Sequence, residues 1–237
     1  SGGATGGSLL GSTLMIVAIY LVAPFMLMLV RKQPWKAFVP VFVLIFIHFV
    51  WFGLLDHGDQ SHYQISEVIA LASLLVWVPL LIAHMRRFVW PEGSRPWLIA
   101  FAVWGATLVL NGVFTFLPHV LDHWKFTNAL VAHVHIAMAG MITSFNVLVL
   151  MVINQHTVLR NVFRSRMFFW CWQGGTVVHA ASMLAAGTLE AMFPSWLFTG
   201  HPAMNALYAV RLAAGLLMAS ASISWLVRSH ITKKVTS

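Results

Sequence analysis

Long runs of apolar residues, separated by short polar stretches, extend from one end of the chain to the other. Each run is about 20 residues long or more, which suits a membrane-spanning helix and not the roughly 10-residue strand of a membrane barrel. The pattern predicts an all-α, polytopic membrane helical bundle that forms a single domain over residues 1–237. The seven expected transmembrane segments are 9–30, 38–55, 66–85, 97–117, 127–153, 167–190 and 203–227.

Composition supports a lipid environment for this bundle. The chain has 237 residues, of which 59% are apolar and 8% are charged, whereas soluble domains carry about 25% charged residues. A lipid bilayer is therefore the expected surrounding, and its core requires every backbone group to bond within helices. The net charge of +8 does not indicate nucleic acid, because the charges fall in short loops. The single cysteine, Cys171, excludes an internal disulfide and a Cys-x-x-Cys-His heme attachment site.

The charged loops alternate in sign along the chain and predict an orientation. Basic residues follow the first, third and fifth segments and end the chain, and such loops remain cytoplasmic. The N-terminus is then outside and the C-terminus cytoplasmic, in the inner membrane of a bacterium or archaeon. The remaining loops are expected outside and hold the acidic residues Asp56, Asp59, Asp122 and Glu190.

Twelve histidines are many for so apolar a chain, and most of them gather toward the outer face. Three lie on the cytoplasmic side, which leaves nine of the twelve in the outer half. Four of these lie within helices, roughly 10–16 Å below the outer helix ends at about 1.5 Å per residue. They either hydrogen-bond to neighbouring helices or share a buried cofactor. The four are His48, His133, His135 and His179.

The sequence AHVHIAMAG contains the sharpest local signal, the pair His133 and His135. Residues two apart on a helix point about 200° apart, so these two side chains cannot chelate one metal on a regular helix. They can ligate two different cofactors, and neutral imidazole is a normal axial ligand of heme iron. Small residues around the pair would allow a flat macrocycle to approach, although they also suit ordinary helix packing.

The run FTNALVAHVHIAMAGMITSFNVLVLMVI resembles the tenth helix of the heme-copper oxidase superfamily, in its nitric oxide reductase branch. The resemblance implies that His133 is the proximal ligand of a high-spin heme and that His135 is an axial ligand of a low-spin heme. The stretches MFFWCWQGGTVVHAASMLAAGTLEAMF and YAVRLAAGLLMA are similar to the eleventh and twelfth helices. ISEVIALASLLVWVPLLIAHM is similar in placement to the eighth, so the resemblance covers most of the chain as a C-terminal half.

Arg211 lies roughly 12 Å below the outer face, at 8 residues past Ala203. A buried arginine requires an anionic partner. A heme propionate is one candidate for that partner, and Glu190 or Asp122 is the alternative.

The family's second metal site is altered in this sequence. Three histidines form that site in the family, but the counterpart of the sixth helix has no histidine here, and the paired histidines of the seventh correspond to Asp56 and His57. A carboxylate can replace imidazole at non-heme iron, so Asp56, His57 and either His48 or His62 are candidate ligands of iron or copper. His48 and His57 face opposite sides of a straight helix, so sharing a metal requires the helix to end between them. A glutamate expected near Val76–Pro79 is also missing.

The first five helices of the family have no counterpart in the chain, and they carry the other low-spin heme ligand. If His135 binds that heme, its partner ligand is His48, His179 or a histidine of another chain. A companion membrane subunit that supplies the missing helices explains this, and a degenerate paralogue is the alternative.

The sequence therefore predicts a heme-binding membrane subunit of a respiratory oxidoreductase, resembling nitric oxide reductases or terminal oxidases. One or two hemes b are expected, with cytochrome c or quinol as the electron donor. Two alternatives stay open, a non-catalytic scaffold or heme-b electron-transfer subunit and a heme-free transporter.

Overall fold

The structure is a computed structural model that describes residues 7–30, 33–55, 63–157 and 159–236. Regular structure in these ranges is helical, apart from one isolated antiparallel bridge between Val30 and Phe88. The all-α prediction is confirmed for this part of the chain. Asp56, His57 and His62 lie outside the described residues.

All seven predicted segments are helical, and five of the resulting rods are long and apolar enough to cross a membrane. This identifies an integral membrane protein. Of the other two, α1 (Gly7–Met26) contains a shorter apolar stretch, and α10 (Arg166–Met192) is long but carries polar residues such as Gln173 and Glu190. The five rods are Trp35–Leu55, Ile65–Met85, Arg95–Thr115, Asn128–Ile153 and Pro202–His230.

The chain divides into two compact units, and α5 (Arg95–Thr115) passes from one to the other. The first unit covers residues 1–89 and 109–121, and the second covers 90–108 and 122–237. The single domain expected from the sequence stays a prediction at this level.

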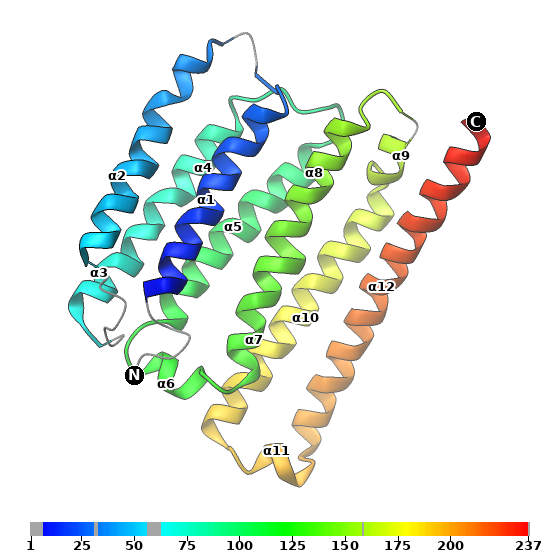
Figure 1. The fold of residues 1–237 in the computed structure, drawn as a ribbon. Helices are drawn as coiled ribbons and strands as arrows, with labels where there is room; N and C mark the ends of the chain where they lie inside the picture. The colour runs from blue at the N-terminus through cyan, green and yellow to red at the C-terminus, as the bar shows by residue number, and fades with distance from the viewer. Residues whose placement is uncertain (1–6, 31–32, 56–62, 158, 237) are drawn as a thin grey trace. The chain divides into compact units, whose positions relative to one another are not determined.

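Three long helical segments and the last turns of α5 form the first unit (Figure 1). Pro79 interrupts one of them, because a proline lacks the N–H that would bond to the carbonyl of Leu75 and its ring crowds that carbonyl. The rod accordingly takes a 3₁₀ turn just before this point. Aromatic side chains pack together in this unit near Phe38, which stacks on Phe88 with 5.2 Å between the ring centroids. The elements are α1, η2 (Trp35–Phe38), α2 (Val39–Leu55), α3 (Ile65–Ser73), η3 (Leu74–Val76) and α4 (Trp77–Met85).

The second unit is built around α10, which packs against α7 and α12 (Figure 1). The rod Asn128–Ile153 consists of α7 (Asn128–His135), the π-helix η4 (Ile136–Ile142) and α8 (Thr143–Ile153). The other elements are α6 (Val120–Trp124), which straddles the boundary, α9 (Leu159–Phe163), α11 (Trp196–Thr199) and α12 (Pro202–Thr236).

Two glycines allow α10 to approach its neighbours closely. A Cβ atom added at Gly187 would lie 1.9 Å from the backbone nitrogen of Ala129 on α7. A Cβ atom added at Gly175 would lie 2.6 Å from Cγ of Met218 on α12. Small residues at such crossings let membrane helices pack backbone to backbone. The contact at Gly187 is the stricter of the two, because a backbone atom cannot rotate away as the end of a methionine can.

We predict that Gly187→Ala destabilises the protein by about 1–3 kcal/mol, because the added methyl group must push α7 and α10 apart. Gly174→Ala is the matched control on the same helix, since its Cβ would meet no atom within 4 Å. The control should be neutral or stabilising, as alanine has the better helix propensity by about 1 kcal/mol. Thermal unfolding in detergent measures both variants, and equal effects would contradict the packing described here.

Candidate functional site

Two histidines from different helices face one another in the second unit. His135 is the last residue of α7, and His179 lies midway along α10. Their ring centroids are 4.9 Å apart, and the ring planes are inclined by 37°. Of the four membrane-depth histidines singled out in the sequence, the structure brings these two together.

Hydrogen bonds fix the tautomer of both neutral rings. Nδ1 of His135 donates to the carbonyl oxygen of Val131 at 2.9 Å, and Nδ1 of His179 donates to the carbonyl oxygen of Arg211 at 3.2 Å. A carbonyl oxygen only accepts, so the proton of each neutral imidazole is on Nδ1 and Nε2 carries a lone pair. This is the arrangement in which histidine binds metals, with its second nitrogen held by a backbone carbonyl.

The π-helix η4 begins directly after His135. Such wide turns leave some carbonyl groups to other donors and are frequent at functional sites. Here Trp172 Nε1 donates to the carbonyl of Ala139 at 2.9 Å, and Thr143 Oγ1 donates to that of Met138 at 2.8 Å. The sequence reading missed this element. Its signal was limited to the small residues around Gly140, which also fit an ordinary helix crossing.

A buried polar chain supports the π-helix from the side of α10. Trp104 Nε1 donates to Oε1 of Gln173 at 2.6 Å, and Nε2 of Gln173 donates to Ser144 Oγ at 3.3 Å. Ser144 in turn donates to the carbonyl of Gly140 at 2.7 Å. Gln173 is a polar residue in a strongly apolar segment. Its presence there was the sequence signal that could have predicted this series of buried hydrogen bonds.

The structure corrects the prediction that Glu190 lies in an outer loop. Glu190 lies in the last turn of α10 and is only 3% exposed. Its carboxylate accepts from the backbone N–H of Asn128 at 2.7 Å, from the Asn128 side-chain amide and from the Tyr208 hydroxyl at 3.1 Å. An anion at the start of α7 is favourable, because the first N–H groups of a helix lack partners within it.

Arg211 joins the same network from α12. Its Nη1 donates to Oδ1 of Asn128 at 2.8 Å, and its guanidinium lies 5.2 Å from the ring centre of Tyr208. Glu190 is thus one residue away through Asn128, although Arg211 forms no direct ion pair within the described ranges. A guanidinium has five N–H donors, so the contact with Asn128 leaves donors for a further anion. The propionate contact stays a prediction.

His133 precedes His135 by two residues on α7 and is half-buried. Helical periodicity turns it about 200° from His135, so it lies on another flank of the rod. The two histidines of the motif therefore lie in separate environments on different sides of one helix.

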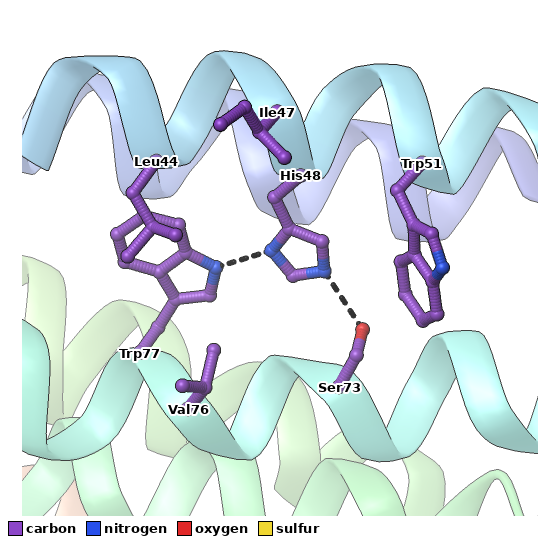
Figure 2. A pocket seen from close by; sticks show the side chains of 7 residues that line it. All are labelled: Leu44, Ile47, His48, Trp51, Ser73, Val76 and Trp77. Atoms are coloured by element: carbon purple, nitrogen blue, oxygen red, sulfur yellow. Dashed lines mark hydrogen bonds between the residues drawn. The ribbon is translucent and has the colours of Figure 1, made fainter.

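His48, in the first unit, has both ring nitrogens engaged (Figure 2). Nδ1 accepts from Trp77 Nε1 at 2.6 Å, so the ring proton is on Nε2, which lies 2.8 Å from Ser73 Oγ and donates to it. The ring stacks on Trp77 at 5.9 Å and borders a hollow of about 290 Å³. No lone pair is left for a metal in this arrangement. Among the described residues, no three histidine, cysteine or acidic side chains are grouped for metal binding.

The distance between His135 and His179 tests whether one heme fits between them. A histidine nitrogen binds a metal at about 2.1 Å, so two imidazoles on opposite sides of one iron have centroids about 6.4 Å apart. The observed 4.9 Å is too short for a porphyrin held between the two rings. His179 is therefore not the opposite axial ligand of a heme on His135 in this arrangement.

Comparison of the chain with known protein families, with curated proteins and with solved structures finds no match.

We predict that Glu190→Gln lowers the free energy of unfolding by about 1–3 kcal/mol, because an amide presents N–H groups to donors that need an acceptor. Glu92→Gln is the matched control. The Glu92 side chain is 80% exposed and pairs with Arg164 at the surface, where an ion pair contributes at most about 1 kcal/mol. Denaturant unfolding in detergent compares the two, and a Glu190 variant as stable as the control would contradict the capping role.

Proposed function

We propose that this protein is a heme-binding membrane subunit of a respiratory oxidoreductase, nitric-oxide-reductase-like or terminal-oxidase-like. The observation that carries the proposal is the divided His-x-His motif. His135 is directed toward α10 in the protonation state of a metal ligand, while His133 occupies another flank of α7. One helix thereby offers imidazoles to two separate centres, which a transporter does not require.

The proposal includes a full topology of seven spans, with the N-terminus outside and the C-terminus cytoplasmic in a bacterial or archaeal membrane. Helical segments at all seven expected positions and the alternating charge of the loops support it. In this orientation the start of α7 and the end of α10 lie toward the outer face. The histidines of the site are then on the side where a cytochrome c or quinol would deliver electrons.

The donor chemistry of α7 would suit an iron porphyrin on His133. Its imidazole would be the axial ligand, and Ala137, one turn further along, is small enough to leave room for a flat group. The guanidinium of Arg211 contacts Asn128 on the His135 face of α7, so it would bind a propionate of a heme on that face. The heme would supply the redox chemistry that reduces nitric oxide or oxygen, while the protein sets its ligand, its orientation and the low-dielectric surroundings.

A second heme on His135 would need its other axial ligand from a companion membrane subunit. His179 is too close to oppose it across a porphyrin, and both nitrogens of His48 are engaged. This requirement supports the expectation that the chain works within a larger assembly. The same engagement of His48 favours a second candidate function, a non-catalytic scaffold or heme-b electron-transfer subunit that lacks the non-heme metal.

Heme content of the purified protein tests the proposal. A pyridine hemochrome assay should detect heme b, and carbon monoxide should shift the spectrum of the high-spin heme held by His133. His133→Ala should remove most of this carbon-monoxide-sensitive signal, because the iron loses its axial ligand. His156→Ala, at an exposed position near the expected cytoplasmic end of α8, is the control and should retain full heme content.

The other outcomes separate the alternatives. Heme bands that do not respond to carbon monoxide would favour the electron-transfer subunit. Wild-type protein without heme absorbance would rule out the proposal and leave the heme-free transporter.

A further inference from the structure

We infer that the end of the second unit at which α9 packs on α12 binds the phosphate group of an anionic phospholipid, through Arg160 and Arg228 beside Trp225. The inference goes beyond the proposed function, because it needs neither a heme nor a particular orientation of the chain in the membrane. Three features carry it, which are the charge of this end, its height in the bilayer and two hydrogen-bond donors without acceptors.

This end of the second unit carries far more positive than negative charge. Five arginines lie at the start of α5, in and beside α9, and toward the end of α12, whereas Glu92 is the one carboxylate among them. Glu92 pairs with one of these arginines at 3.2 Å. Five positive charges against one negative charge leave an excess of four, and such basic clusters beside membrane helices attract anionic headgroups. The five are Arg95, Arg160, Arg164, Arg166 and Arg228.

The ends of the membrane-spanning rods place this cluster at the level of lipid headgroups. The rod Arg95–Thr115 begins with one of the arginines, and the rod Pro202–His230 ends two residues after Arg228. Trp170 follows Arg166 by about one helical turn and is 67% exposed, as is typical of the aromatic belt at a membrane surface. The arginines therefore lie where the phosphate groups of phospholipids lie.

Aromatic contacts join α9, α12 and the start of α10 at this end (Figure 1). The ring of Trp225 on α12 lies 5.9 Å from that of Phe163 on α9. The guanidinium of Arg228 lies 4.6 Å from the ring centre of Phe168 on α10. Arg160 precedes Phe163 by three residues, so the two share one side of α9. One arginine from each of two helices therefore borders the same group of rings.

Two N–H groups at this end have no acceptor among the residues that the structure describes. They are Nε of Arg160 and Nε1 of Trp225, and both atoms are shielded from solvent. The rings around Trp225 offer these groups only aromatic faces, which are weak acceptors. Both groups can only donate, so the partner that they lack is an acceptor, and a guanidinium binds an anionic oxygen most strongly. Both side chains are partly exposed, which leaves a side from which an anion can approach.

A phospholipid supplies both the anion and an apolar part that this surface requires. Its phosphate oxygens accept from several N–H groups at once, in the fork geometry that arginine favours. Its acyl chains would lie along α12, where Leu226 and Val227, next to Trp225, are 71% and 49% exposed. A soluble anion has no group that would cover these side chains. The combination therefore favours a lipid over free phosphate.

Native mass spectrometry of the full-length protein in detergent, titrated with phosphatidylglycerol or phosphatidylcholine, tests the site. Wild type should bind one phosphatidylglycerol per chain, about tenfold more tightly than phosphatidylcholine, because only the former is anionic. Arg160→Gln should weaken phosphatidylglycerol binding by about tenfold, since charge-assisted hydrogen bonds are lost. Trp225→Phe keeps an aromatic ring without the N–H group and should weaken it by a smaller factor.

Arg164→Gln is the matched control. It removes the same charge from the same part of the chain, but Arg164 is already paired with Glu92, so binding should stay within about twofold of wild type. Equal losses in Arg160→Gln and Arg164→Gln would overturn the inference, because they would show general attraction in place of a site. Two results on the unaltered protein would also overturn it, whether or not a variant folds. These are equal binding of the two lipids and displacement of phosphatidylglycerol by an equal concentration of inorganic phosphate.

Discussion

The close crossing of α10 over α7 at Gly187 and Ala129 is the constraint on which the rest of the second unit depends. The two helices run in opposite directions, since the start of α7 contacts the end of α10. His179 and Glu190 are eleven residues apart, and Asn128 and His135 are seven apart, so each pair repeats on nearly the same helix face, within about 20°. Only a close approach of the α7 and α10 backbones lets the side chain of Glu190 reach Asn128 while the two imidazole rings stay in contact.

Arg211 extends this constraint to a third helix. Its side chain binds Asn128 at the start of α7, while its backbone carbonyl holds the ring of His179. One residue of α12 therefore connects the Asn128–Glu190 hydrogen bonds to the histidine pair. Polar groups that satisfy one another in this way are expensive to rearrange in lipid, because no water replaces a broken bond. The network fixes the register of α7, α10 and α12. Apolar contacts alone would leave these helices free to slide along one another.

Much of the fold was predictable from the sequence, because lipid imposes helices on every long apolar run. The positions of all seven helical segments follow from this rule. The rotation of each helix did not, since a segment that is apolar on all sides carries no signal for the face that packs inward. For this reason Glu190, which ends an apolar run, was taken for a loop residue although it caps α7. The π-helix after His135 was equally hidden, since its residues suit a regular helix.

The candidate site shows why depth in the membrane was an incomplete guide to its histidines. His48 and His179 look alike in the sequence, as single imidazoles within apolar helices. In the structure the ring of His48 uses both nitrogens, between an indole N–H and a hydroxyl group, and so completes its hydrogen bonding. His135 and His179 each donate from Nδ1 to a backbone carbonyl, and their ring centroids lie 4.9 Å apart. The number of ring nitrogens left without a protein partner, which depends on packing and not on sequence position, separates a histidine that stabilises the fold from one that can bind a metal.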